Sequence, residues 1–268
     1  MEKKNQQQDI KKTIRKTYSK IALQDSNESG TSCCAPTCCS GGNGGVGSPT
    51  QAATVVGYEI SELESVPQAS ILGVGCGAPV KFADLQGGET VVDLGSGAGI
   101  DVFLSAKKVT LDGRVIGIDM TDEMLERARR NAKDGGYTNV DFRKGDIEET
   151  IPLDENSADV VISNCVINLT TDKVKAFKEI HRILKNGGRM VISDLVSEGK
   201  ICPKESIDLD RWSSCIDGAL IKDDYIASIR KAGFQIINVL EERPYMEEDD
   251  APETGGRKII SMVVKAVK

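Results

Sequence analysis

The stretch VVDLGSGAG, residues 91–99, constrains the fold of this chain more than any other part of its sequence. Residues 90–94 predict a short strand that leads into a glycine turn, and a helix is expected to begin near Ala98. Glycines let the backbone turn tightly and approach a ligand closely, and a helix N-terminus presents unpaired N–H groups. The G-x-G-x-G spacing differs from the G-x-G-x-x-G of dinucleotide sites, and the strand carries the acid Asp93. Because an acid repels a pyrophosphate, the loop favours a cationic ligand such as S-adenosylmethionine.

From residue 90 onward, predicted strands alternate with predicted helices. Seven strands are predicted, at 90–94, 114–119, 139–143, 158–163, 189–194, 234–240 and 258–267. Several are rich in Val and Ile with little alternation, which is typical of strands covered on both faces. Helices are predicted after Gly99, over 122–133 and 172–184 with Thr121 and Thr171 as N-caps, and over 223–231. This series indicates an α/β fold with a doubly wound, mainly parallel sheet of seven strands and ligands at the carboxyl ends of its strands.

Residues 1–53 are expected to form an N-terminal region that consists of a helix and a flexible linker. Apolar residues at spacings of three and four predict a weak helix within residues 1–25, with one face made of Ile10, Ile14, Tyr18 and Ile21. The linker is rich in glycine, lacks apolar periodicity and carries the cysteines Cys33, Cys34, Cys38 and Cys39. Residues 54–268 are expected to form the main domain, with an insertion near 197–221 that is placed to contact substrate.

The composition excludes several classes of function. A net charge of −7 argues against a nucleic-acid-binding surface, which needs clustered Lys and Arg. No apolar run approaches the length of a membrane span, and the polar start MEKKNQQQDIKK has no signal-peptide core, so a cytoplasmic location is expected. Thiols stay reduced there, so the eight cysteines favour metalloid-binding, catalytic or redox roles over structural disulfides. With a single His, mixed His/Cys zinc sites and Ser-His-Asp chemistry are largely excluded.

Polar residues follow three further strands at the edge where the glycine loop lies. Asp119 ends the second strand, where a carboxylate can accept hydrogen bonds from both ribose hydroxyls. Asp146 follows the third strand, where a carboxylate can accept from an adenine amino group, and Asn164 follows the fourth. Each could be an ordinary turn residue, but their order favours a donor site. The residues expected to bind S-adenosylmethionine are Asp93, Gly95, Ser96, Gly97, Gly99, Asp119, Met120, Asp146, Ile147 and Asn164.

Three cysteines outside the linker are expected on loops at one edge of the sheet. Cys165 directly follows the fourth strand, and Cys215 lies in the insertion after the fifth. Cys76 lies in a glycine-rich loop that is able to fold over the same rim. A single cysteine of this kind is more often a small buried residue than a ligand. Three of them together would form a cup of thiolates, and soft thiolates select soft, thiophilic centres.

Several stretches of the sequence resemble the arsenite S-adenosylmethionine methyltransferases. They are GYEISELESVP, LGVGCGAPV, VVDLGSGAGIDVFLSA, VIGIDMTDEML, SNCVINL and SSCIDGAL, in the part of the chain that runs from about Val55 to the end. The GCGAP loop and the cysteine of SNCVINL are not general features of methyltransferases, so these motifs are specific. The resemblance implies a Rossmann-like class I methyltransferase fold. It also implies methyl transfer from S-adenosylmethionine to trivalent arsenic, as part of arsenic detoxification.

The resemblance further implies roles for the cysteines. Cys165 and Cys215 would bind As(III), Cys76 would join them, and Cys33 or Cys34 would be a further redox cysteine. The substrate would be arsenite or its thiol conjugates. A thiol reductant such as thioredoxin or glutathione would reopen disulfides formed during turnover. The number of methyl groups added stays open, as do the roles of Cys38, Cys39 and Cys202.

Two other functions stay open on the sequence alone. A methyltransferase acting on carbon or nitrogen of a small organic molecule would carry incidental cysteines and would tolerate Cys165→Ser. A non-catalytic protein that sequesters arsenite through the same cysteines would not consume S-adenosylmethionine. The intact glycine loop with Asp119 disfavours the sequestering protein, because such a protein has no use for a donor site.

Overall fold

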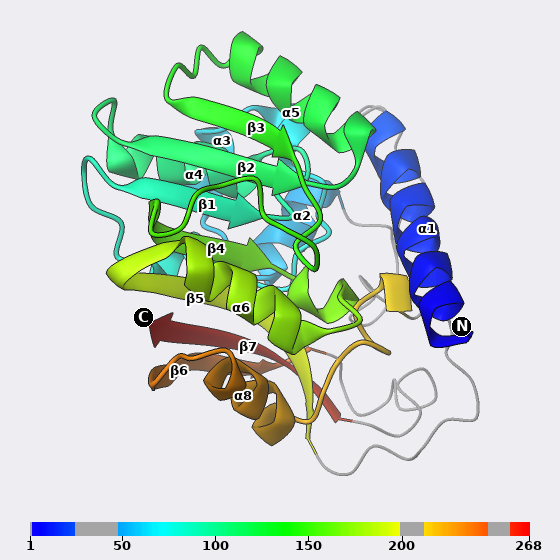
Figure 1. Cartoon of the computed structure of the whole chain (residues 1–268). Coiled ribbons are helices and arrows are strands. Elements are labelled where there is room, and N and C mark those ends of the chain that lie inside the picture. The colour runs from blue at the N-terminus through cyan, green and yellow to red at the C-terminus, as the bar shows by residue number, and fades with distance from the viewer. Residues whose placement is uncertain (1, 25–47, 199–211, 246–257) are drawn as a thin grey trace.

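A computed structural model of the chain describes residues 2–24, 48–198, 212–245 and 258–268. Within these residues the seven predicted strands form one sheet, in the order β3-β2-β1-β4-β5-β7-β6 (Figure 1). The strands are β1 (Thr90–Leu94), β2 (Arg114–Asp119), β3 (Val140–Lys144), β4 (Ala158–Asn164), β5 (Leu184–Glu198), β6 (Ile236–Pro244) and β7 (Lys258–Val267). The cysteines that lie outside the described residues are Cys33, Cys34, Cys38, Cys39 and Cys202.

Strands β1 to β5 run parallel to one another, and β7 runs antiparallel between β5 and β6. Val91 of β1 pairs with Val115 of β2 on one side and with Val160 of β4 on the other. This arrangement confirms the predicted α/β fold with a doubly wound, mainly parallel sheet. In such sheets the strand order reverses beside the first strand, and ligands bind in the crevice at the carboxyl ends there.

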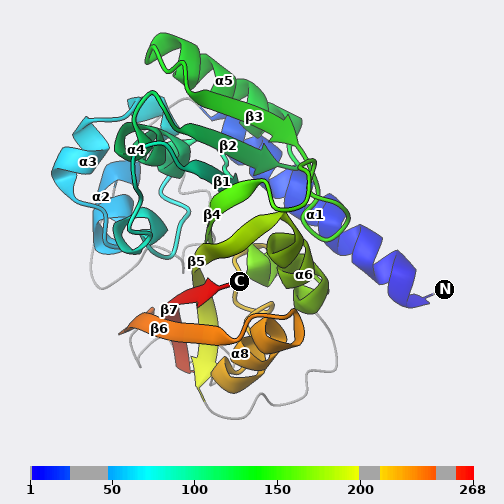
Figure 2. The same ribbon diagram turned by 60° about the vertical axis from the view of Figure 1, so that its left-hand side comes forward.

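Helices cover both faces of the sheet (Figure 2). α4 (Ile100–Val109) and α5 (Asp122–Asp134) pack on one face, and α6 (Lys173–Ile183) and α8 (Lys222–Lys231) pack on the other. Consecutive residues of β1 point into opposite cores, because Val91 packs with α4 and Val92 packs with α6. Both of these valines are fully buried. Burial on both faces explains why the strands are rich in Val and Ile without alternation.

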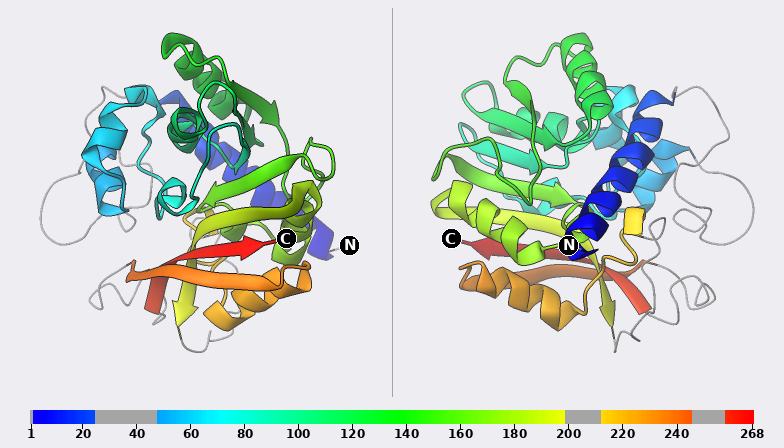
Figure 3. Two further views of the ribbon diagram at one scale, coloured as in Figure 1. Left: turned by 90° about the vertical axis from the view of Figure 1, so that its left-hand side faces the viewer. Right: turned by 45° about the vertical axis from the view of Figure 1, so that its right-hand side comes forward.

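The residues before β1 add a helix across the end of the sheet and several short elements. The predicted N-terminal helix is present as α1 (Glu2–Leu23), and it lies across the carboxyl ends of the parallel strands (Figure 3). The boundary expected at residue 53 falls inside the next helix. The short elements are α2 (Pro49–Val55), α3 (Ile60–Glu64) and the 3₁₀ turns η1 (Gln68–Ser70), η2 (Pro79–Phe82) and η3 (Ile167–Leu169). No helix in the described ranges is both long and apolar enough to cross a membrane.

The start of α6 and the extent of β5 differ from the predictions. The N-cap of α6 is Asp172, whose side chain accepts a hydrogen bond from the Lys175 N–H at 3.0 Å. Thr171 does not serve as the cap, because its N–H and its hydroxyl both donate to Glu148 Oε1 at 2.7 Å. β5 is longer than the predicted strand at 189–194 at both ends, because it continues to pair with β7 as far as Glu198 and Leu184 pairs with Ala158 of β4.

Candidate active site

A cavity at the carboxyl ends of the parallel strands brings together most of the residues expected to bind the donor. Those that line it are Asp93, Gly95, Ser96, Gly97, Asp119, Met120, Asp146, Ile147 and Asn164. Gly99 is not among the lining residues. It is the N-cap of α4 with a φ of 100°, so this helix begins at Ile100 rather than near Ala98. Cys165 lines the same cavity, whereas Cys76 and Cys215 do not.

The glycine loop presents its backbone to the cavity. Gly95 has a φ of 70°, and a Cβ at this position would overlap the side chain of Val166. Asp119 holds the loop from β2, because its Oδ2 accepts a hydrogen bond from the Gly97 N–H at 3.0 Å. Ser96 Oγ is buried in the cavity wall, and it has no hydrogen-bond partner within the described part of the chain. This hydroxyl is a hydrogen-bonding position that a bound ligand or a water can fill.

Three carboxyls make one part of the cavity acidic. Burial raises the pKa of Asp93 well above its usual range, and the charges of Asp101 and Asp119 raise it further. Burial raises the pKa of Asp101 to about 7, although hydrogen bonds from Tyr58 and Asn164 lower it. Burial also raises the pKa of Asp119. A positively charged ligand would favour the ionised forms of these groups, so the cavity is suited to a cation.

Taken together, these features fit S-adenosylmethionine. The glycine loop leaves room for close approach, the Ser96 hydroxyl lacks a partner, and the acidic region matches the sulfonium and ammonium groups. Asp119 and Asp146 offer carboxylate acceptors for hydroxyl and amino groups at the ends of β2 and β3.

Asn164 connects the acidic region to the loop that carries Cys76. Its Oδ1 accepts hydrogen bonds from the backbone N–H groups of Cys76 at 3.0 Å and Gly77 at 3.2 Å. Its Nδ2 donates to the Tyr58 hydroxyl at 2.9 Å and to the Gly77 carbonyl at 2.6 Å. The Tyr58 hydroxyl in turn donates to the carboxylate of Asp101 at 2.9 Å. Both ends of the Asn164 amide therefore have partners in the protein, and they fix the position of the Cys76 loop.

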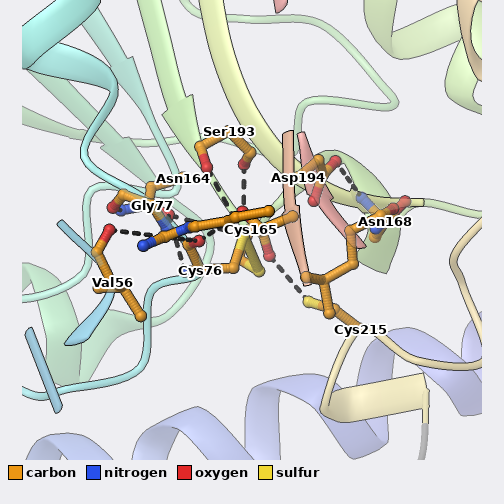
Figure 4. Close-up of a disulfide and its surroundings, with 12 residues drawn as sticks. Val56, Cys76, Gly77, Asn164, Cys165, Asn168, Ser193, Asp194 and Cys215 are labelled. Atoms are coloured by element: carbon orange, nitrogen blue, oxygen red, sulfur yellow. Dashed lines mark hydrogen bonds between the residues drawn. A yellow bond between two sulfur atoms is a disulfide. The ribbon is translucent and has the colours of Figure 1, made fainter. Parts of the chain in front are cut away.

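Cys76 and Cys165 form a disulfide beside the cavity (Figure 4). The Asn164 amide holds the first cysteine, and the Cys165 N–H donates to the Ser193 carbonyl at 2.8 Å. A Cβ at Gly77 would overlap the Ser193 side chain, so glycine lets this loop lie against β5. The sequence favoured metalloid-binding, catalytic or redox roles for the cysteines over structural disulfides, and in this structure these two are bonded to each other. Two sulfurs bonded to each other cannot serve as two thiolate ligands until the disulfide is reduced.

Cys215 lies beside the disulfide with its thiol free of a covalent bond. Its Sγ donates a hydrogen bond to the backbone carbonyl of Cys165 at 3.0 Å. Cys165 and Cys215 have φ angles of 61° and 66°, a region that residues other than glycine rarely adopt, at a cost of about 1–3 kcal/mol each. Trp212 anchors this turn, because its Nε1 donates to the Leu169 carbonyl at 3.0 Å. Strain at two adjacent cysteines indicates a functional constraint.

Charged residues near the sulfurs are a part of the site that sequence patterns did not single out. A carboxylate oxygen of Asp194 in β5 lies within 4.8 Å of both sulfurs of the disulfide. Its Oδ2 accepts hydrogen bonds from the Tyr225 hydroxyl at 2.9 Å and the Asn168 N–H at 3.0 Å. Burial raises the pKa of Asp194 to about 7. Burial lowers the pKa of Lys173 to about 8, although the charges of Asp194 and Cys215 act to raise it.

Helix α1 contributes further cavity residues that the sequence analysis did not assign to the site. Lys11, Ile14 and Tyr18 line the cavity, and Lys11 Nζ lies 2.7 Å from Asp146 Oδ2. The helical periodicity placed Ile14 and Tyr18 on the buried face. Lys11 lies one turn before Ile14 on that face, and this spacing is the signal that identifies it.

Known proteins with similar sequences and structures place this site in context. A protein-family profile for the methyltransferase domain matches residues 85–233. A curated arsenite methyltransferase from Halobacterium salinarum is 37% identical over 97% of this chain and 67% of its own length. An arsenite methyltransferase from Aquipseudomonas alcaligenes is 36% identical over 69% of this chain and 55% of its own length. The chain therefore spans about half to two thirds of the length of these two relatives. The crystal structure of an arsenic(III) S-adenosylmethionine methyltransferase from Chlamydomonas reinhardtii has a TM-score of 0.63 and 32% identity, and the match covers 82% of this chain and 73% of that one.

Proposed function

The chain belongs to the arsenite methyltransferases, and we propose that it transfers methyl groups from S-adenosylmethionine to trivalent arsenic held by its cysteines. The observation that supports this most is the position of Cys165. This residue lines the donor cavity, and its sulfur is bonded to that of Cys76. An arsenic atom held by these sulfurs would lie beside the donor. A methyltransferase of organic substrates has no need of paired cysteines at this point.

In this proposal the cavity holds the donor through residues at three strand ends. Asp119 accepts hydrogen bonds from the ribose hydroxyls, and Asp146 accepts one from the adenine amino group. Asp93 and Asp101 attract the positive charges of the donor. When bound, S-adenosylmethionine supplies a methyl group on a sulfonium centre, which the lone pair of trivalent arsenic can take up.

The site needs no general base, because the arsenic lone pair carries no proton. This agrees with the position of His181, the single histidine of the chain, which packs against Phe234 with ring centroids 5.1 Å apart. The contribution of the protein is then mainly orientation. Well-aligned reactants can gain about 7–11 kcal/mol of barrier reduction in this way.

Arsenite binding requires the reduced form of the cysteine pair. Two external thiols convert the Cys76–Cys165 disulfide into two protein thiols and leave as one external disulfide, so the reductant supplies two electrons and two protons. The thiols of Cys76, Cys165 and Cys215 then each displace one hydroxyl from arsenite and release one water. Three sulfur ligands leave the arsenic lone pair on the opposite side.

A disulfide is also the expected product of a later step. After methyl transfer the arsenic is formally pentavalent, and two cysteine thiols can return it to the trivalent state by giving up two electrons. The Cys76–Cys165 bond is the form that such a pair would reach. Thioredoxin or glutathione would reopen it, which suits the cytoplasm and a role in arsenic detoxification. Cys33 or Cys34, outside the described residues, stays the proposed further redox cysteine.

Arsenic speciation tests the proposal directly. The purified protein is incubated with arsenite, S-adenosylmethionine and a dithiol reductant, and the arsenic species are separated and identified by mass spectrometry. We expect methylated arsenic, with one S-adenosylhomocysteine formed per methyl group. Arsenic that is bound without consumption of the donor would indicate a sequestering protein instead. Donor consumption that persists in Cys165→Ser without methylated arsenic would show that the methyl group goes to an acceptor other than cysteine-bound arsenic.

A further inference from the structure

Helix α1 contacts both parts of the candidate site. It crosses the carboxyl ends of the parallel strands and passes beside the cysteines (Figures 3 and 4). Lys11, Ile14 and Tyr18 line the donor cavity. Ile10 and Ile14 are 3% and 2% exposed, and they belong to the same apolar cluster as Cys76, Cys165 and Cys215. A single helix therefore covers the donor cavity and the sulfurs together.

Lys11 is the one Lys or Arg among the described residues that line the cavity. Its ammonium lies 2.7 Å from Asp146 Oδ2 and 3.3 Å from Glu148 Oε2. The other oxygen of Asp146, Oδ1, accepts a hydrogen bond from the Glu148 N–H at 3.0 Å. Both oxygens of the Asp146 carboxylate are therefore held in place, one of them by α1.

The surroundings of Lys11 keep it charged. Burial alone lowers the pKa of Lys11, but the hydrogen bond to Asp146 and the charges of Glu148 and Asp146 more than offset this, so the pKa is raised. The three side chains are 20%, 12% and 7% exposed in the order Lys11, Asp146 and Glu148. Water therefore screens this cluster less than an ion pair on the open surface. Without the ammonium, two carboxylates would lie side by side at the edge of an acidic cavity.

The C-terminal end of α1 is anchored separately. Ser19 Oγ donates to Glu123 Oε2 of α5 at 2.9 Å. Arg127 of α5 donates from Nη1 to the backbone carbonyls of Ala22 at 2.9 Å and Gln24 at 2.7 Å. These contacts lie away from the cavity. Over the cavity itself, the Tyr18 hydroxyl donates to the Ser213 carbonyl at 3.4 Å. The Lys11 cluster is the charged contact of α1 there.

From these contacts we propose that α1 is the roof of the donor site and that Lys11 is a positioning residue, which holds Asp146 for the adenine amino group of S-adenosylmethionine. The proposal rests on the proposed function, because it takes the cavity to bind this donor. A carboxylate oxygen can accept two hydrogen bonds, so an oxygen fixed by Lys11 can accept a second one from the amino group. Removal of the ammonium leaves Asp146 held only through the Glu148 N–H and takes the nearest cation away from both carboxylates.

Titration calorimetry with S-adenosylhomocysteine tests the role of Lys11. Lys11→Met removes the charge and keeps much of the side-chain length, and we expect it to weaken binding about ten-fold, in line with the loss of one charge-assisted contact. Lys11→Arg keeps a cation and should restore most of the affinity. Lys12→Met is the matched control, because Lys12 is the exposed neighbour on the same helix. It should bind like the wild type.

A double variant separates positioning from a general loss of structure. If Lys11 acts through Asp146, Lys11→Met should have little further effect in an Asp146→Asn background. Additive losses, or a Lys11→Arg variant as weak as Lys11→Met, would mean that Lys11 only stabilises the fold, and the proposal would be overturned. Hydrogen exchange tests whether α1 covers the bound donor. Amide exchange in α1 should slow when S-adenosylhomocysteine is added, and unchanged exchange would contradict this role of the helix.

The outcomes also distinguish this inference from the proposed function. If the wild type does not bind S-adenosylhomocysteine, the proposed donor site is wrong and the role of Lys11 is wrong with it. If the wild type, Lys12→Met and Lys11→Met all bind equally well, the donor site stands and only the role of Lys11 is refuted.

Discussion

Asn164 Oδ1 accepts a hydrogen bond from the Cys76 N–H at 3.0 Å, although the two residues are 88 positions apart in the chain. Asn164 also directly precedes Cys165, so one residue fixes the Cys76 loop next to the strand end that carries the second sulfur. Its amide also donates a hydrogen bond to the Tyr58 hydroxyl, which in turn donates to the Asp101 carboxylate. The sequence assigned Asn164 to the donor site, and the structure shows that its hydrogen bonds go mainly to the Cys76 loop.

Asn164→Ala should impair arsenic binding more than donor binding. The substitution leaves the buried N–H groups of Cys76 and Gly77 without an acceptor, at a cost of about 1–3 kcal/mol each. The Cys76 loop should then hold its sulfur less well. The affinities for arsenite and S-adenosylhomocysteine, measured on the reduced protein, check this. Asn139→Ala is a control, since the Asn139 side chain donates hydrogen bonds to the Ala106 and Thr110 carbonyls, away from the site. A loss confined to the donor would refute this role.

Serine substitutions at the three described cysteines should stop methyl transfer. Cys76→Ser, Cys165→Ser and Cys215→Ser each remove one soft ligand, and the misplaced arsenic should react at least about a hundred-fold more slowly. Affinity for S-adenosylhomocysteine should stay near that of the wild type. Initial rates of arsenic methylation and donor affinities are measured side by side. Full activity in Cys165→Ser would show that arsenic binds elsewhere.

Asp119→Ala should weaken donor binding and leave arsenite binding nearly unchanged. Asp119 holds the glycine loop through the Gly97 N–H, and it is the proposed acceptor for the ribose hydroxyls. Loss of one charged acceptor should lower donor affinity about ten-fold or more. Asp122→Ala is the control, because that carboxylate is exposed and pairs with Lys144 at 2.6 Å on the surface. Calorimetry that shows the reverse pattern would overturn the assignment of the cavity.

The contribution of Asp101 to the stability of the donor-free protein should fall as pH rises from about 4 to about 7. Burial raises the pKa of Asp101 from 3.8 to about 7, so the native state binds more protons than the unfolded state within that window. The stabilising effect is fully present below the pKa that Asp101 has in the unfolded state. It is lost as pH rises through the pKa of Asp101 in the native state, by at most about 1.4 kcal/mol per pH unit. Urea unfolding of the wild type and Asp101→Asn at several pH values isolates this contribution. Parallel pH profiles for the two proteins would count against it.

The sequence predicted the parts of the molecule that depend on local pattern. The Val- and Ile-rich strands, the glycine loop and the acids at strand ends follow from periodicity and from the place of turns in α/β sheets. Asp119 and Asp146 accordingly both line the cavity at the strand ends.

The rest depends on contacts between distant elements, which no local pattern encodes. Lys11 meets Asp146 across 135 positions because α1 lies over the sheet. Asp194 approaches the disulfide only because β5 carries it to the same edge as Cys165. The positive φ angles of Cys165 and Cys215 likewise arise from packing rather than from residue type.

A single-turnover experiment tests most directly whether the cysteines hold arsenic for methylation. The reduced protein is loaded with one equivalent of arsenite, mixed with S-adenosylmethionine that carries a deuterated methyl group, and quenched before a second turnover. We predict that mass spectrometry will find the labelled methyl group on arsenic, together with the loss of two protein thiols for each arsenic atom that returns to the trivalent state. Arsenic that stays unlabelled while bound to the protein would contradict the proposed function.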